Sequence, residues 1–122
     1  MLIITDFIAK HELKPLRKYF DIKDLLDGAD KVLKNLATQI KPPQNFPDIR
    51  FFKVRIGGTV KGRMIVFMIT ENKKIVPVLI RLKKDKIFGM NMAMNNPQVV
   101  SQIKTNLDRI FQDIQAKRFQ QF

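Results

Sequence analysis

The sequence predicts a single α+β domain, with two N-terminal helices packed on a small curved antiparallel sheet and a further helix at the C-terminal end. Before residue 41 and after residue 96, apolar residues recur every three or four positions, as in amphipathic helices. Between these regions, short apolar segments alternate with turn residues, as in a meander of strands. A chain of 122 residues has the length of one domain, so residues 1–122 are assigned to one unit.

The N-terminal third is expected to be mainly helical. Leu2–Thr5 predicts a short first strand, and residues 6–20 predict a helical segment that breaks near Pro15, because proline fits only the first turn of a helix. Asp21 is a suitable cap for the second helix, and Gly28 inside it costs about 1 kcal/mol relative to alanine. The apolar stripe of that helix, which ends before two consecutive prolines, comprises Ile22, Leu25, Leu26, Ala29, Leu33, Leu36, Ala37 and Ile40.

Three strands are predicted next. Residues 52–56 alternate apolar and basic side chains, so the two kinds are expected on opposite faces, with the apolar ones under the N-terminal helices. Residues 64–69 are apolar throughout, as in a central strand, and residues 71–74 read as a turn. Residues 75–82 form the third strand, in which Pro77 favours an edge position or a bulge.

The C-terminal region predicts one long helix. After a loop at 86–95, Asn96 is a suitable N-cap and Pro97 suits the first helical position. Phe119 and Phe122 lie in a glutamine-rich tail with few apolar neighbours, so this tail is expected to fray. The apolar stripe of the helix comprises Val99, Val100, Ile103, Leu107, Ile110, Phe111 and Ile114.

The charge is strongly basic and unevenly distributed. The net charge is +12, and residues 50–90 hold 11 of the 23 basic residues but only 2 of the 11 acidic ones. A folded sheet displays such an excess as a compact positive field, which marks proteins that bind polyanions. The alternative reading is a basic surface that serves solubility alone. We expect a polyanion partner, with RNA as the first choice.

Composition also excludes several classes of site. The chain has no cysteine and one histidine, so a disulfide framework, a cysteine nucleophile and a metal site are not expected. No phosphate-binding or dinucleotide fingerprint occurs, and no cofactor is predicted. The opening residues lack a basic n-region, and no apolar stretch approaches the roughly 20 residues of a membrane helix, so a cytoplasmic protein with no membrane partner is expected.

The order of elements and three basic motifs resemble the RelE/ParE toxin superfamily. The motifs are Phe52–Ile56, then Gly62–Phe67 with Arg63 after the glycine, then Leu79–Lys84. Toxins of this family carry a similar basic first meander strand, a similar Gly-x-Arg-apolar start to the next strand and a basic cluster at the end of the third. The resemblance covers residues 1–86 by element order and 50–86 by motif.

The resemblance implies the toxin of a toxin–antitoxin pair, which would cleave messenger RNA on the ribosome by attack of the 2′-hydroxyl on the adjacent phosphate. Lys53 and Arg55 would then be the catalytic pair of the first strand, with Lys53 the better base if nearby positive charge lowers its pKa. Arg63 would clamp the scissile phosphate. Arg81 competes with its neighbours for the cluster that closes the third strand. The residues expected to bind the nucleic acid are Lys61, Lys83, Lys84 and Lys86.

The sequence also departs from this family. Its only tyrosine, Tyr19, and its only histidine, His11, both precede the meander, whereas the nuclease branch places such a residue near the C-terminal end. Two alternatives therefore stay open beside the endoribonuclease. One is a binding-only module or a toxin like the ParE branch, which poisons DNA gyrase without the nuclease residues. The other is an interaction protein that binds an acidic partner and dimerises through the last helix.

Each site residue also has a purely structural interpretation. Lys53 and Arg55 would simply be the solvated side of an amphipathic strand. Arg63 would pair with Glu71 or cap a carbonyl group. The cluster at 81–86 would be a solubilising strand end.

Overall fold

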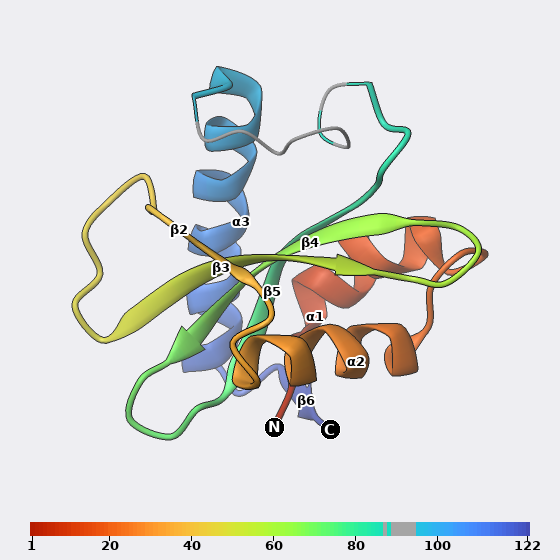
Figure 1. Cartoon of the computed structure of the whole chain (residues 1–122). Helices are drawn as coiled ribbons and strands as arrows, with labels where there is room; N and C mark the ends of the chain where they lie inside the picture. The colour runs from red at the N-terminus through yellow and green to blue at the C-terminus, as the bar shows by residue number, and fades with distance from the viewer. Residues whose placement is uncertain (87, 89–94) are drawn as a thin grey trace.

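The computed structural model describes residues 1–86, 88 and 95–122, so most of the loop predicted at 86–95 lies outside the described residues. The described chain is α+β, with helices on both faces of an antiparallel sheet (Figure 1). The elements in chain order are β1 (Ile3–Thr5), α1 (Asp6–Ile8), η1 (Ala9–Leu13), η2 (Lys14–Leu16), α2 (Ile22–Leu33), β2 (Thr38–Ile40), β3 (Ile49–Ile56), β4 (Gly62–Ile69), β5 (Ile75–Leu82), α3 (Pro97–Gln115) and β6 (Phe119–Gln121).

The predicted meander is confirmed. Strands β3, β4 and β5 pair as antiparallel neighbours in a four-stranded sheet of order β2-β3-β4-β5. Strand β4 is an inner strand and almost entirely buried, as the apolar sequence of its residues 64–69 predicts. Pro77 lies in β5 at one edge of the sheet, opposite Val66, where the pairing register shifts. The proline therefore occupies both of the settings that its missing N–H allows.

Of the two N-terminal helical segments predicted on the face with Phe52, Val54 and Ile56, helix α2 packs there. The first segment instead contacts β5 and α3, so that part of the predicted arrangement is wrong. A capping box starts the helix, since the backbone N–H of Asp24 donates to Asp21 (3.1 Å) and the reverse bond measures 3.0 Å. A Cβ atom at Gly28 would lie 2.8 Å from Cγ2 of Ile56 and 2.8 Å from Cε of Met64. The glycine thus lets the helix approach β3 and β4 closely, and this contact compensates for its low helix propensity.

The predicted extent of this helix is wrong at its C-terminal end. Helix α2 ends at Leu33, and Asn35 adopts a left-handed conformation with φ 61°. The N–H of Leu36 donates to the carbonyl of Lys31 (2.8 Å), and the N–H of Asn35 donates to that of Val32 (3.2 Å), as in a Schellman cap. The chain then turns into β2, which pairs with β3. The apolar residues beyond position 33 mimic helical spacing although they belong to a cap and a strand.

The first helical segment begins where predicted and ends earlier. It starts at Asp6, where the Thr5 hydroxyl caps the N–H of Ile8 (3.4 Å), and tightens into η2 at Pro15. It ends at Leu16, four residues before the predicted end. Phe20 instead turns inward and becomes fully buried beneath the β3–β4 turn, where a Cβ at Gly62 would lie 2.4 Å from its ring.

Helix α3 covers the opposite face of the sheet from α2 (Figure 1). The Asn96 side chain accepts from the N–H of Gln98 (2.9 Å), which confirms the predicted cap. Phe111 of the helix lies 5.9 Å from Phe67 of β4, and Phe67 lies 5.9 Å from Phe51 of β3, between ring centroids. These aromatic contacts join α3 to the middle of the sheet.

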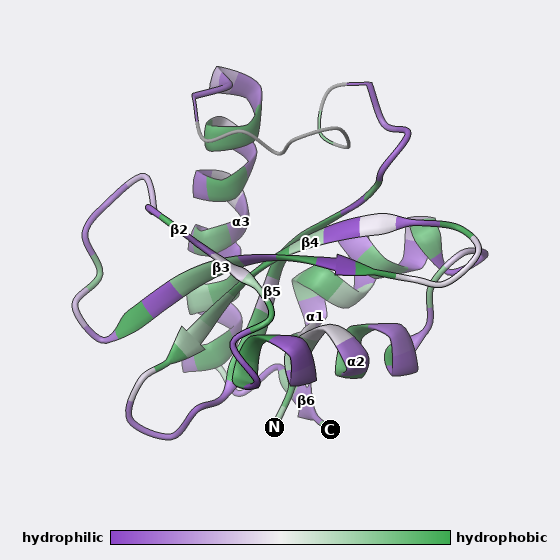
Figure 2. Ribbon diagram, viewed as in Figure 1, coloured by the Kyte–Doolittle hydropathy of each residue, from purple (hydrophilic) through white to green (hydrophobic). Residues whose placement is uncertain are grey.

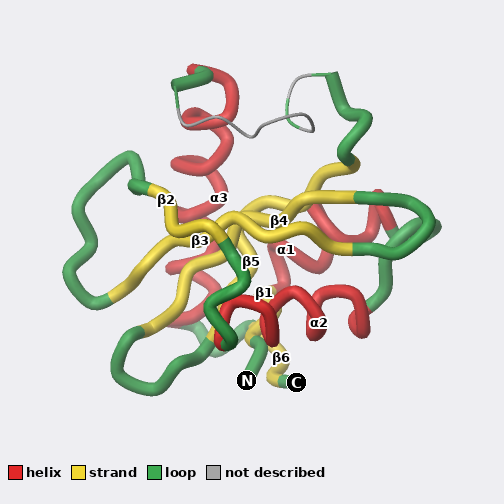
Figure 3. Tube along the Cα trace, in the orientation of Figure 1, coloured by secondary structure: helices red, strands yellow, loops and turns green. Residues whose placement is uncertain are grey.

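The C-terminal tail is not frayed, contrary to the expectation for Phe119 and Phe122. Residues 119–121 form β6, which pairs with β1 in a two-stranded antiparallel sheet (Figure 3). Leu2 and Phe122 exchange backbone hydrogen bonds of 3.0 and 2.8 Å. The buried carboxylate of Asp113 accepts from the N–H of Phe7 (2.7 Å) and from Nε of Arg118 (3.0 Å), which fixes the tail against α1. These long-range partners are not visible in the local sequence.

In residues 1–86, 88 and 95–122, the structure contains no helix with the length and apolar character needed to cross a membrane.

Candidate nucleic-acid interface

Three arginines stand in one row across the meander. Arg55 of β3 is the register partner of Arg63 of β4, and Arg63 is in turn the partner of Arg81 of β5. Residues directly opposite in antiparallel strands project from the same face of the sheet. The three predicted arginines therefore come together on the α3 face, at the end of the sheet formed by the β3–β4 turn and the end of β5.

Four lysines extend this row. Lys53 precedes Arg55 by two residues and projects from the same face. The backbone N–H of Lys83 donates to the carbonyl of Lys61 (2.9 Å), which continues the pairing of β4 with β5. Lys61, Lys83 and Lys84 line a hollow of about 450 Å³ together with Thr59 and Val60. We call the whole group the cationic sheet end: Lys53, Arg55, Lys61, Arg63, Arg81, Lys83 and Lys84.

The cationic sheet end lies beyond the apolar middle of the sheet. Figure 2 shows hydrophilic and hydrophobic colours alternating along β3, with a hydrophilic segment close to the turn to β4. Arg55 is exposed, and Lys53 and Arg63 are half-buried. Lys86, the remaining predicted contact, is exposed in the segment after β5.

The cations perturb one another. Partial burial and, after it, the positive charge of Arg63 hold the pKa of Lys53 below its usual range. Within the part of the chain that the structure describes, the side chains of Arg55 and Arg63 make no ion pair. Glu71, the alternative partner of Arg63, follows the far end of the eight-residue strand β4. The arrangement therefore leaves two guanidinium groups available to an anion.

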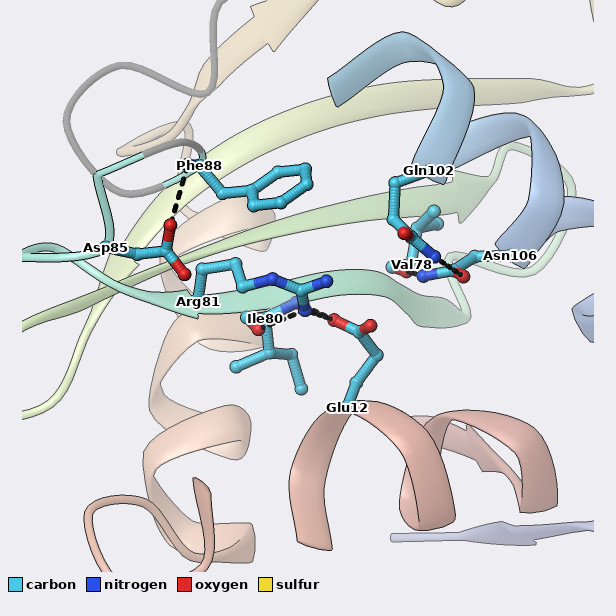
Figure 4. A network of polar contacts seen from close by, with 8 residues as sticks. All are labelled: Glu12, Val78, Ile80, Arg81, Asp85, Phe88, Gln102 and Asn106. Atoms are coloured by element: carbon cyan, nitrogen blue, oxygen red, sulfur yellow. Dashed lines mark hydrogen bonds and ion pairs between the residues drawn. The ribbon is translucent and has the colours of Figure 1, made fainter. Parts of the chain in front are cut away.

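Arg81 is held differently. Its Nη1 atom donates both to the carboxylate of Glu12 and to the carbonyl of Ile80 (2.9 Å) (Figure 4). The guanidinium carbon lies 4.7 Å from the centroid of the Phe88 ring. Among the described residues, Nε and Nη2 of Arg81 have no hydrogen-bond partner, so one edge of the fork stays open.

Glu12 is the polar residue that the sequence did not reveal as part of this region. It is buried, and its carboxylate also accepts from the N–H of Ile80 (2.8 Å) on the outer edge of β5. Burial raises the pKa of Glu12, and the charge of Arg81 and the hydrogen bonds of Ile80, Arg81 and Asn106 oppose that shift. Glu12 joins η1 to β5 across 69 positions of sequence from Arg81, and no local pattern signals such a contact.

The only histidine, His11, and the only tyrosine, Tyr19, differ in their position relative to the cationic sheet end. His11 is exposed, with its ring 4.6 Å from that of Phe7, on η1. Tyr19 is also exposed, but the ammonium of Lys84 lies 5.6 Å from its ring centroid. The fold thus brings the only tyrosine to the border of the cationic sheet end, a position that its sequence number does not suggest.

In the described ranges, histidine, aspartate and glutamate side chains form no group of three or more that could hold a metal ion. Comparison with protein-family models, with curated proteins and with solved structures gives no match to this chain. The resemblance to RelE/ParE toxins therefore stays a prediction that rests on the sequence motifs, and the function is argued from the cationic sheet end itself.

Proposed function

We propose that the chain binds RNA through the cationic sheet end and acts as an mRNA-cleaving toxin, which a cognate acidic antitoxin neutralises by covering the same surface. The cross-strand row of Arg55, Arg63 and Arg81 carries this proposal. Guanidinium groups bind phosphates through paired N–H donors, and several of them at one end of a sheet can contact phosphates of one nucleic-acid strand. Antitoxin and ribosome are expectations from the family resemblance.

The proposed chemistry uses the lowered pKa of Lys53. A neutral lysine amine accepts the proton of the 2′-hydroxyl, the 2′ oxygen forms a bond to phosphorus, and the bond to the 5′ oxygen breaks. The leaving 5′ oxygen takes a proton from solvent. Arg63 and Arg55 bind the phosphate oxygens, on which negative charge accumulates in the transition state.

A second candidate is RNA binding without cleavage. The carboxylate of Glu12, which pairs with Arg81 of the row, already accepts hydrogen bonds from Arg81 and from the N–H of Ile80. His11 lies against Phe7 instead. Apart from Lys53, the cationic sheet end supplies cations that hold a phosphate, and these suffice for a binding module.

The deciding experiment measures binding and cleavage of the same labelled mRNA fragment. We expect the logarithm of the association constant to fall linearly with the logarithm of salt concentration, with a slope set by the number of phosphates neutralised. Cleavage during translation in a cell-free system supports the toxin, and its absence with intact binding supports the binding module. A slope near zero, or no binding at low salt, contradicts both.

A further inference from the structure

A second hollow lies next to Arg81. It measures about 400 Å³ and is lined by Phe88 from the segment after β5 and by residues of the first two turns of α3. Because the ring of Phe88 also lies over the guanidinium of Arg81, this hollow adjoins the row of arginines. The lining residues from α3 are Pro97, Gln98, Ser101 and Gln102.

The position of Phe88 is fixed from two sides. Its backbone N–H donates to the carboxylate of Asp85 (3.0 Å), and its ring contacts the guanidinium of Arg81 below it (Figure 4). An aromatic ring held in this way offers a flat wall on which a nucleobase can stack.

The amide of Gln102 is oriented by a chain of hydrogen bonds. Nδ2 of Asn106 donates to the carbonyl of Val78 on the outer edge of β5 (2.7 Å), so Oδ1 of Asn106 must be the acceptor that faces Gln102. Nε2 of Gln102 donates to that oxygen (2.9 Å). The Oε1 atom of Gln102 is thereby turned to the side of Phe88, as Figure 4 shows. The backbone of β5 thus dictates that the hollow presents a hydrogen-bond acceptor.

We propose that this hollow binds a single nucleobase that carries an exocyclic amino group, with the base against Phe88, its amino group donating to Oε1 of Gln102 and the adjoining phosphate on the open edge of Arg81. The proposal rests on the proposed RNA binding and adds base selectivity to it. Glu12 acts here as a positioning residue, because it occupies Nη1 and leaves Nε and Nη2 for the phosphate.

Uracil fits this hollow less well than adenine. Uracil carries carbonyl oxygens in place of an amino group, and its N3–H donor lies between two of them. A hydrogen bond from N3–H to Oε1 of Gln102 therefore brings a carbonyl oxygen of the base close to the same acceptor, and the two oxygens repel each other. Adenine supplies an amino donor and a larger ring system for stacking. A site built to hydrogen-bond a particular group discriminates against the analogue that lacks it, because its own polar atom is then left unpaired.

The test changes one group of the ligand and needs no variant that risks misfolding. Fluorescent uridine hexamers are compared in which one central residue is adenosine, purine riboside or uridine; purine riboside differs from adenosine only in lacking the amino group. We expect the wild-type protein to bind the adenosine oligomer about three- to tenfold more tightly than the purine riboside oligomer, the effect of one hydrogen bond.

Protein variants then locate the effect. In Gln102→Leu the preference for adenosine over purine riboside should disappear, whereas Gln112→Leu, at an exposed position near the end of the same helix, should retain it. Equal affinity of the wild type for both oligomers, or a preference that persists in Gln102→Leu, overturns the inference. Salt-dependent binding without base preference would leave the RNA-binding function standing and reject only the nucleobase site. Absence of all RNA binding would reject both.

Discussion

The carboxylate of Glu12 accepts hydrogen bonds from the guanidinium of Arg81 and from the backbone N–H of Ile80, and so fastens the first helical segment to the outer edge of β5. An unpaired N–H on an edge strand is a liability, and this carboxylate covers it. The same contact fixes the third arginine of the cross-strand row. One buried residue therefore both covers the N–H of Ile80 at the edge of the sheet and fixes the position of Arg81 in the cationic sheet end.

Replacing Glu12 by alanine should destabilise the fold strongly. The change leaves a largely buried guanidinium and a buried N–H without their acceptor, and the loss of one member of such a pair costs about 3–5 kcal/mol. Glu12→Gln keeps an oxygen that accepts from Ile80 and should cost less. Urea denaturation measures both, with Glu71→Ala in an exposed turn as the control expected to stay within about 0.5 kcal/mol of the wild type. Equal stability of Glu12→Ala and the control would contradict this role.

The stability should also depend on pH through Glu12. Burial raises its pKa above the ordinary 4.5, so the folded chain holds this proton more tightly than the unfolded chain does. The contribution of Glu12 to the free energy of unfolding is therefore complete below pH 4.5 and is lost as pH rises through the raised pKa. Relative to Glu12→Gln, which cannot titrate, the wild type should lose stability with rising pH. If the difference in the free energy of unfolding between the wild type and Glu12→Gln stays constant from about pH 4 to about pH 8, the pKa of Glu12 is the same in the folded and unfolded chains.

The pKa of Lys53 should respond to its neighbour. Burial lowers it first and the charge of Arg63 second, so Arg63→Gln should raise the pKa of Lys53 part of the way towards its usual value. An NMR titration of the lysine Cε resonances measures the change. Arg50→Gln, at the opposite end of β3, is the matched control and should leave the titration of Lys53 unchanged. If Lys53 titrates identically in both variants, the charge of Arg63 has no effect on the pKa of Lys53.

Replacing Arg63 by alanine should weaken RNA binding without unfolding the chain. Its side chain makes no ion pair with the described residues, so the free energy of unfolding should change by less than about 1 kcal/mol. Losing one charge-assisted contact to a phosphate should cost about 1.5–3 kcal/mol of binding. Fluorescence anisotropy with Arg50→Ala as control tests this, since Arg50 lies outside the cationic sheet end. Equal losses in both variants would point to a diffuse charge effect instead of a site.

Two glycines should respond oppositely to alanine. A Cβ at Gly28 meets Ile56 and Met64 at 2.8 Å, so overpacking should outweigh the gain in helix propensity and cost about 1–3 kcal/mol. A Cβ at Gly58 meets nothing within 4 Å, and alanine there should be neutral or slightly stabilising because it restricts the unfolded chain. Urea midpoints of the two variants give the comparison. A stabilised Gly28→Ala would show that α2 does not need this close approach.

The sequence predicts those parts of the fold whose signals are local. The alternation in β3, the capping residue Asp21 and the Asn96–Pro97 start of α3 each depend on neighbouring residues, and the structure confirms them. The end of α2 is mispredicted because Leu36 and Ile40 continue the helical spacing by coincidence, while the left-handed Asn35 closes the helix. Strand β6 is missed because its partner lies at the other end of the chain.

The sequence likewise predicts some contacts of the candidate site and misses others. Arg55 and Arg63 meet because a regular meander brings them together, which the sequence pattern predicts. The engagement of Arg81 by Glu12, the approach of Lys84 to Tyr19 and the orientation of the Gln102 amide arise from tertiary contacts between distant segments. No periodicity or motif reports contacts of that kind.

The pairing of β1 with β6 has a consequence for the order of folding. Residues 3–5 and 119–121 meet only after almost the whole chain has been enclosed in one loop, whereas β3, β4 and β5 are joined by short turns. The entropy of closing a loop grows with its length, so contacts between nearby residues form before those between the ends. The hairpins that carry the arginine row should consequently assemble early. The small terminal sheet should be the last to close and, under destabilising conditions, the first to open.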